Sequence, residues 1–159
     1  MQTTQTEADF EQMSWHDCNI WRLDFMVGDP DEGDWTNDLV IGIDFIVEWL
    51  CGVDRATKFK IAPATLAFHG VTDPRIGIDW GHTGLMHEVS IHQILREPIR
   101  DQKVYPGRPY YHWRIPLNWP EGAEISFGAA GYTQTLLAEP LLCDSQRLSL
   151  KERSRLMGR

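Results

Sequence analysis

The sequence predicts an α+β fold, mostly antiparallel β: a twisted antiparallel sheet or sandwich of about seven strands with a short C-terminal helix. Three observations predict it. Apolar and polar residues alternate with period two through several segments, which is typical of half-buried strands. Gly, Pro and Asp residues separate these segments at short intervals. The clearest helix signal is near the C-terminus, where Ser149 and Glu152 have the spacing of a capping box.

A central strand is expected at 38–50. Leu39, Ile41 and Ile43 lie on one face of this strand, and Gly42 and Asp44 lie on the other. A helix could also bury part of this segment, but its β-branched residues and its central glycine favour a strand. Further strands are expected at 18–27, 58–68, 71–79, 111–117, 123–127 and 131–137, and a helix at 150–157.

Several segments give more specific expectations. Pro63 should mark a bulge or an edge in the third strand, because proline cannot donate to a strand ladder. Ile76 and Ile78 should point inward from the fourth strand. Residues 89–96 fit a helix or a strand equally well, and 6–13 fit one or two helical turns. Loops are expected at 28–34, 80–84 and 100–109.

The length of 159 residues suits one domain, which can bury a full core without disulfides or metals. The expected organisation is a flexible N-terminal segment, 1–14, followed by a single β-rich domain, 15–159. Hydrophobic residues make up 42% and charged residues 24% of the chain, which excludes intrinsic disorder and collagen.

The charge balance is acidic. There are 15 Lys and Arg residues against 23 Asp and Glu residues, a formal net charge of −8. Such a field repels nucleic acid and attracts a basic protein, and the same charge also supports solubility. We therefore expect no nucleic-acid partner and favour a protein partner.

The cysteines and the apolar stretches predict a cytoplasmic protein without a membrane segment. Cys18, Cys51 and Cys143 lack the spacing of a zinc site or a disulfide framework, as expected of reduced thiols. The N-terminus shows no signal-peptide pattern. The longest apolar stretch, at 39–51, contains Asp44 and Glu48 and is too short to span a bilayer.

Two polar pairs are expected to have structural roles. His16 and Asp17 should anchor a turn ahead of the first strand, with side chains pointing in opposite directions. Asp44 and Glu48 should share one strand face, about 13 Å apart, which is too far for a carboxylate pair acting on one bond. Each of these two acids needs a cation from a neighbouring strand, and the candidates are Arg22, Lys60 and Arg114.

A histidine-rich stretch offers the alternative of a metal site. His82, His87, Glu88 and His92 could ligate zinc, but only from an irregular loop, because their spacing does not match that of a helical HExxH motif. No cofactor is expected otherwise. Neither a phosphate-binding glycine loop nor a nucleophile-elbow motif occurs.

Acidic residues beside loop tryptophans suggest a partner-binding surface. An exposed tryptophan can anchor a partner while neighbouring acids steer a basic protein toward it. These tryptophans could instead fold back over the core. The candidate contacts are Asp31, Glu32, Asp34, Trp35, Asp79 and Trp80.

Four strings together resemble an uncharacterised bacterial family with the pattern WHD…DIDxIxEW…PATLxF…REP. They are Trp15-His16-Asp17, the segment 38–49, the segment 63–68 and Arg96-Glu97-Pro98. The WHD opening is also similar to some polymorphic-toxin immunity proteins. The resemblance spans 15–146 and implies a β-rich fold and a bacterial, cytoplasmic setting, and it supplies no catalytic residues.

The sequence thus favours a non-enzymatic acidic protein-binding domain, in its most specific form an immunity-type protein that neutralises a basic bacterial toxin. One alternative is a small metal-dependent hydrolase that uses the histidine-rich stretch. Another is a β-rich scaffold that holds a small ligand in a deep apolar pocket. The oligomeric state stays open.

Overall fold

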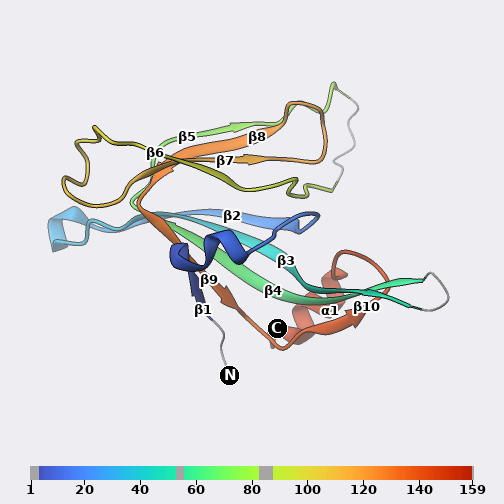
Figure 1. Ribbon diagram of the computed structural model, residues 1–159. Coiled ribbons are helices and arrows are strands. Elements are labelled where there is room, and N and C mark those ends of the chain that lie inside the picture. Colours follow the sequence, from blue (N-terminus) through green and yellow to red (C-terminus); the bar gives the residue numbers. More distant parts are fainter. Residues whose placement is uncertain (1–3, 53–55, 83–87, 159) are drawn as a thin grey trace.

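A computed structural model gives the fold of residues 4–52, 56–82 and 88–158 (Figure 1). Within these ranges the chain is mostly antiparallel β, with two sheets and one short C-terminal helix, so the predicted fold class is confirmed. The two sheets form layers that face each other (Figure 1). No helix in the described ranges has the length and apolar character that crossing a bilayer requires.

The larger sheet has the order β1 (Thr4–Thr6), β9 (Gly131–Leu136), β4 (Thr57–His69), β3 (Asn37–Cys51) and β2 (Asn19–Val27), and β10 (Leu141–Cys143) pairs with the other end of β4. The smaller sheet has the order β5 (Thr72–Gly77), β8 (Glu124–Ala129), β7 (Tyr111–Pro116) and β6 (Leu95–Pro98). Two short 3-10 helices, η1 (Glu7–Gln12) and η2 (Pro30–Glu32), and one α-helix, α1 (Leu150–Leu156), complete the described elements.

Two neighbouring chain segments, β4–β5 and β9–β8, run from the larger sheet into the smaller one and join the two sheets. The chain passes from β4 into β5 through Gly70 and from β8 into β9 through Ala130, and the Ala130 amide donates to the His69 carbonyl at 2.9 Å. Gly70 has a φ of +63°, and a Cβ there would meet the hydroxyl of Tyr105 at 2.6 Å and its ring at 2.8 Å. The glycine therefore permits both the turn and the close packing that fold one sheet over the other.

The core fills the space between the sheets and follows the predicted alternation. Leu39, Ile41 and Ile43 of β3 are fully buried on its inner face. Trp113 of β7 packs edge-on against Phe68 of β4, with ring centroids 5.1 Å apart, so aromatic contacts connect the two layers. The segment 38–50 is therefore extended, as the sequence predicts.

Three sequence expectations about the strands are wrong, two on side-chain orientation and one on the place of a proline. A register shift between Ile46 and Glu48 reverses the later part of β3, so Trp49 is exposed although its position in the sequence predicts burial. Another shift between Thr72 and Arg75, where Asp73 has a φ of +50°, leaves Ile76 of β5 exposed. The second shift contains Pro74, a residue that commonly marks a bulge, whereas no glycine or proline identifies the position of the first.

The third exception is Pro63, which lies inside the sheet rather than at an edge. On one side Pro63 pairs with Asp44 of β3, and on the other the Leu137 amide donates to its carbonyl. β9 pairs with β4 from Ala64 onward, and β10 pairs with it only up to Ile61. The proline thus occupies the gap between two partner strands, where no ladder donor is needed.

Residues 4–14, part of the segment expected to be flexible, take part in the fold. β1 pairs with β9 in the register Thr4–Thr135 and Thr6–Thr133. η1 follows, within the expected 6–13, and its Phe10 packs 5.5 Å from Trp113. Residues 89–96, whose conformation the sequence left open, contain isolated bridges and the start of β6 and no helix.

The helix α1 forms where the capping box predicts it. The Ser149 amide donates to a carboxylate oxygen of Glu152 at 2.8 Å, and the Glu152 amide donates to the Ser149 hydroxyl at 3.2 Å. The Ser149 hydroxyl also donates to the Glu152 carboxylate, at 2.6 Å, and this bond, together with the one from the Ser149 amide, holds the pKa of the Glu152 carboxyl below its usual value. The box fixes the start of a helix only seven residues long, which brings Arg153 onto the larger sheet.

The three free thiols are expected to differ in reactivity. Burial raises the pKa of the Cys18 thiol to about 12, so its thiolate fraction at pH 8 is on the order of 10⁻⁴. Cys143 is buried and Cys51 is exposed. Iodoacetamide at pH 8 should therefore alkylate Cys51 first, and the other two only after unfolding, as peptide mass spectrometry would show. Rapid alkylation of native Cys18 would contradict the described packing.

Candidate functional site

The hairpin that joins β2 to β3 carries four of the predicted contact residues. Its tip contains η2, which Asp29 caps by accepting from the Asp31 amide at 3.0 Å. Gly33, with a φ of +76°, ends η2, and the Asp34 carboxylate accepts from the Thr36 amide at 2.9 Å. Hydrogen bonding to the side chain of Thr36, and then to its amide, lowers the pKa of the Asp34 carboxyl. The tip is thus an ordered turn that projects from the body of the molecule (Figure 1).

The hairpin combines exposed apolar side chains with acids. Trp35 is 77% exposed, and the end of β2 exposes Phe25, Met26 and Val27 at 52%, 51% and 71%. No Lys or Arg occurs between Arg22 and Arg55 in the sequence. We call this set the hairpin surface; its members are Asp24, Phe25, Met26, Val27, Asp29, Asp31, Glu32, Asp34 and Trp35.

The structure does not bring the other two predicted contacts to the hairpin surface. The segment 78–82 follows β5 at the opposite end of the molecule from the 28–36 tip (Figure 1). Asp79 is exposed and accepts from the Gly81 amide at 2.8 Å. Trp80 is half-buried, and its enclosed Nε1 has no hydrogen-bond partner among the described residues. Asp79 and Trp80 therefore belong to a separate surface.

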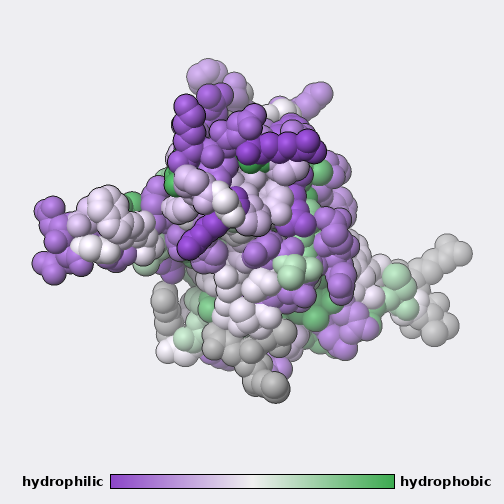
Figure 2. Space-filling model, turned by 60° about the vertical axis from the view of Figure 1, so that its left-hand side comes forward, coloured by the Kyte–Doolittle hydropathy of each residue, from purple (hydrophilic) through white to green (hydrophobic). Residues whose placement is uncertain are grey.

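The exterior around these segments is mainly hydrophilic. Figure 2 brings the left-hand side of Figure 1 forward and shows small, separate hydrophobic patches among hydrophilic side chains. Against such a surface, four exposed apolar side chains on one hairpin, Phe25, Met26, Val27 and Trp35, are a local exception.

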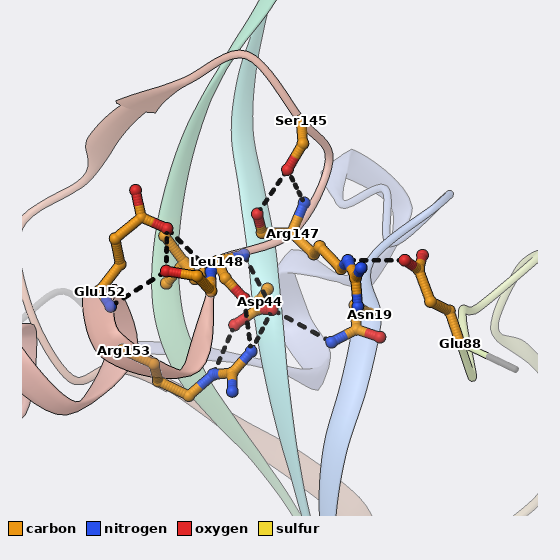
Figure 3. Close-up of polar contacts among 9 residues, drawn as sticks. Asn19, Asp44, Glu88, Ser145, Arg147, Leu148, Glu152 and Arg153 are labelled. Atoms are coloured by element: carbon orange, nitrogen blue, oxygen red, sulfur yellow. Dashed lines mark hydrogen bonds and ion pairs between the residues drawn. The ribbon is translucent and has the colours of Figure 1, made fainter. Parts of the chain in front are cut away.

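The second polar cluster surrounds Asp44, which is fully buried (Figure 3). Its carboxylate accepts two hydrogen bonds from Arg153, from Nε at 3.0 Å and from Nη2 at 2.7 Å. The Asn19 side chain at 3.1 Å and the Leu148 amide at 3.2 Å also donate to it. The cation comes from α1 and not from Arg22, Lys60 or Arg114, so that expectation is wrong for Asp44.

A polar cavity of about 510 Å³ adjoins this cluster. Asn19, Trp21, Arg147 and Arg153 contribute to its lining. The Trp21 ring lies 5.1 Å from the Arg153 guanidinium and covers Gly42, where a Cβ would meet the ring at 2.9 Å. Both carboxylate oxygens of Asp44 accept hydrogen bonds from Arg153. The role of this pair is therefore to hold α1 on the larger sheet.

The remaining predicted polar residues form surface pairs. Lys60 contacts Glu48 at 2.6 Å, which confirms the predicted cation for that acid. Arg114 binds Glu124 on the neighbouring strand, with its closest contact at 2.6 Å, and Arg22 contacts Asp24 within β2. These pairs are all partly exposed, so each contributes little to stability.

His16 and Asp17 lie close together, contrary to the expectation. Asp17 has a φ of +62°, so the chain turns there and His16 Nε2 lies 3.5 Å from the Asp17 carboxylate. Asn118 and Gln146 donate to that carboxylate at 2.8 and 2.9 Å. His16 also bonds the His92 carbonyl through Nδ1 at 2.9 Å. The pair joins segments distant in the sequence, which is the anchoring role that the sequence predicts.

The histidine-rich stretch gives no metal site within the described ranges. His87 lies outside them. Glu88 pairs with Arg147 at 2.6 Å, and the His92 ring lies 5.5 Å from the His16 ring. His82 is exposed in a turn with a φ of +59°. No group of three or more potential ligands gathers anywhere in the part of the chain that the structure describes.

One hydrogen-bonded chain was not predicted. His69 Nδ1 lies 2.9 Å from the Asp38 carboxylate, and His69 Nε2 lies 2.8 Å from the Thr133 hydroxyl. An acid, a histidine and a hydroxyl in this order also form nucleophilic triads. Thr133, however, is in the middle of β9 and pairs with Ala67 and Thr6, so the ladder occupies the backbone that could stabilise an oxyanion.

Comparisons with protein families, curated proteins and solved structures give no match for this chain. The resemblance drawn from the four strings therefore stays a prediction.

Sequence reasoning missed the apolar half of the hairpin surface. Alternation places Phe25 and Val27 on one face of the strand together with Leu23, which is half-buried. Phe25 pairs with Leu39, the residue of β3 at which the pairing with β4 ends, so beyond this point the hairpin has only two strands. A strand that extends past its sheet still alternates apolar and polar residues, but no neighbouring layer buries its apolar side chains. In the sequence, the nearby 28–34 turn signals that the strand is about to leave the sheet.

Proposed function

We propose that this chain is an acidic protein-binding domain whose hairpin surface binds a basic protein. The observation that carries the proposal is the exposure of Trp35, at 77%, on an ordered tip rich in acids and free of cations. Buried tryptophans contribute strongly at protein interfaces, and acids around them favour encounter with a basic partner.

The ordered tip supports binding rather than a purely solvated loop. Asp29 and Asp34 each accept a backbone hydrogen bond, so part of the acidic set holds the turn in shape. The side chains of Asp31 and Glu32 are exposed and form no such bond within the described structure. A pre-ordered turn loses less conformational entropy on binding than a flexible loop.

In its most specific form the proposal is an immunity-type protein that occludes a basic bacterial toxin. The support is the acidic hairpin surface together with the resemblance of Trp15-His16-Asp17 to immunity proteins. Occlusion requires no catalytic group, so this function depends only on contact area and charge complementarity.

Affinity capture from the native organism tests the general proposal. The baits are the wild-type chain and the variant Asp31→Asn/Glu32→Gln/Trp35→Ala. The matched control, Asp101→Asn/Glu121→Gln/Trp119→Phe, also removes two exposed acids and alters one loop tryptophan. We expect mass spectrometry to find a basic protein on the wild type and the control, with at least tenfold less on the hairpin variant and less at 0.5 M than at 0.05 M salt. Equal capture by all three baits, or capture that salt does not change, would contradict the proposal.

The immunity form has its own readout. The captured protein, expressed alone in a bacterial host, should arrest growth, and co-expression of the wild-type chain should restore it. The hairpin variant should not restore growth although it folds and accumulates. A captured partner that is harmless on expression would exclude the immunity form and leave the general proposal standing.

A further inference from the structure

The outer edge of β2 is open beside the hairpin surface. β2 is the last strand of the larger sheet and pairs only with β3 along 22–27. Near its start, the Ile20 amide donates to the Val89 carbonyl at 2.6 Å and Asn19 bridges Ser90. Beyond these contacts, no described residue pairs with this edge. An open edge presents unpaired backbone donors and acceptors that another strand can use.

The register identifies which amides face outward. The Gly28 amide donates across the hairpin to the Thr36 carbonyl at 2.8 Å. In an antiparallel ladder, residues alternate between facing the partner strand and facing away. Met26 and Asp24 therefore bond to β3, and the amides and carbonyls of Val27, Phe25 and Leu23 face the open edge.

The side chains at this edge define what an added strand would carry. Phe25 and Val27 are exposed on one face of β2, and Asp24 and Met26 lie on the other. Asp24 contacts Arg22 of the same strand. An added strand would place its apolar residues beside Phe25 and Val27 and its basic residues beside Asp24, where they would compete with Arg22 for the carboxylate.

We propose that the basic partner docks by adding an extended segment, with alternating apolar and basic residues, to the outer edge of β2 at Leu23, Phe25 and Val27. This inference rests on the proposed function and specifies its mode of contact. Main-chain hydrogen bonds would provide affinity, and the hairpin surface would provide selectivity for charge.

Charge argues against a second copy of this chain as the occupant. Pairing β2 with β2 of another molecule would join two hairpin surfaces that each carry Asp24, Asp29, Asp31, Glu32 and Asp34, in two chains that each have a formal net charge of −8. Like charges placed opposite each other destabilise a strand pair. A basic segment removes this repulsion, so the structure favours a different partner.

Amide hydrogen exchange measured by NMR tests the docking mode. The probe is the blocked peptide Lys-Val-Lys-Val-Lys-Val-Lys-Val. The control peptide, Lys-Val-Lys-Pro-Lys-Pro-Lys-Val, has the same charge but lacks two strand donors. At a free peptide concentration ten times the Kd, we expect exchange of the Leu23, Phe25 and Val27 amides to slow about tenfold, with Asp24 and Met26 unchanged. The control peptide should give no such protection.

Two variants separate the contribution of the Val27 backbone amide to peptide binding from that of the Val27 side chain. Val27→Pro removes an outward-facing donor without breaking the ladder to β3, and Val27→Ala keeps the donor. We expect Val27→Pro to weaken binding of the alternating peptide about fivefold relative to Val27→Ala, with circular dichroism spectra unchanged.

The outcomes distinguish this inference from the proposed function. Peptide binding at the tip without protection of these three amides, or equal binding of both peptides, would overturn strand addition and leave the capture result standing. Failure of both peptides to bind would also overturn strand addition. Protection that appears without peptide and rises with protein concentration would assign the edge to a second copy. The capture experiment decides the proposed function independently.

Discussion

Replacing Arg153 by methionine should lower the free energy of unfolding by about 3–5 kcal/mol, because it leaves the buried Asp44 carboxylate without its cation. Asp44 is fully buried and receives two of its hydrogen bonds from the Arg153 guanidinium. The bonds from Asn19 and the Leu148 amide remain, but neither carries a full charge. Breaking one side of a buried ion pair is costly for this reason.

Urea unfolding followed by tryptophan fluorescence measures this loss. A change of this size in a chain of 159 residues also lowers the Tm by roughly 6–20 °C. The matched control is Lys60→Met, which breaks the pair with Glu48 at 2.6 Å. Both side chains of that pair are nearly half exposed, so the expected loss is below about 1 kcal/mol.

A double variant makes the argument about charge specific. Asp44→Leu combined with Arg153→Met removes the ion pair entirely and keeps apolar volume, so stability should return to within about 1–2 kcal/mol of the wild type. Arg153→Met as stable as Lys60→Met would contradict the assigned role of Asp44. A double variant as unstable as Arg153→Met alone would attribute the loss to packing of the Arg153 side chain on Trp21.

The Asp44 cluster also shows what sequence can and cannot predict here. A carboxylate in the middle of an apolar strand requires a cation, and that requirement follows from the cost of burying charge. The identity of the cation does not follow, because Arg153 is 109 positions away in the sequence and reaches Asp44 only after α1 docks on the sheet. Residue patterns within each segment predict the strand β3 and the helix α1, but only tertiary packing brings Asp44 and Arg153 together.

Period two predicts the strands well because burial between two sheets enforces alternation. It fails at Trp49 and Ile76, where one extra residue in the strand reverses the side chains that directly follow it. For the candidate site, composition predicted the acidic tip and Trp35. It could not predict that Phe25 and Val27 lie beyond the cover of the sheet, since this depends on where the pairing of β4 ends.

Trp113→Ala should cost about 3–5 kcal/mol of folding free energy, the range of a fully buried tryptophan replaced by alanine. The indole is completely buried and lies 5.1 Å from Phe68 and 5.9 Å from Tyr132, both in the other sheet. Its Nε1 donates to the Ala129 carbonyl at 3.1 Å. The variant therefore leaves a cavity between the layers and removes one hydrogen bond to a buried carbonyl.

Trp113→Phe keeps a variant measurable if the alanine variant fails to fold. It retains a ring in the layer contact but loses the indole N–H, and we expect a smaller loss of about 1–3 kcal/mol. Trp35→Ala is the matched control, since Trp35 is 77% exposed and its removal should change stability by no more than about 0.5 kcal/mol. Equal urea midpoints for Trp113→Ala and Trp35→Ala would contradict the assigned core.

The two tryptophans should also separate stability from binding. Trp113→Phe weakens the contact between the sheets but leaves the hairpin surface intact, so below its unfolding transition it should still capture the basic partner. Trp35→Ala should show the reverse, with wild-type unfolding and reduced capture. Because the tip projects beyond the pairing of β4, its contacts contribute little to the core, and a loss of binding without a loss of stability is the result that the geometry requires.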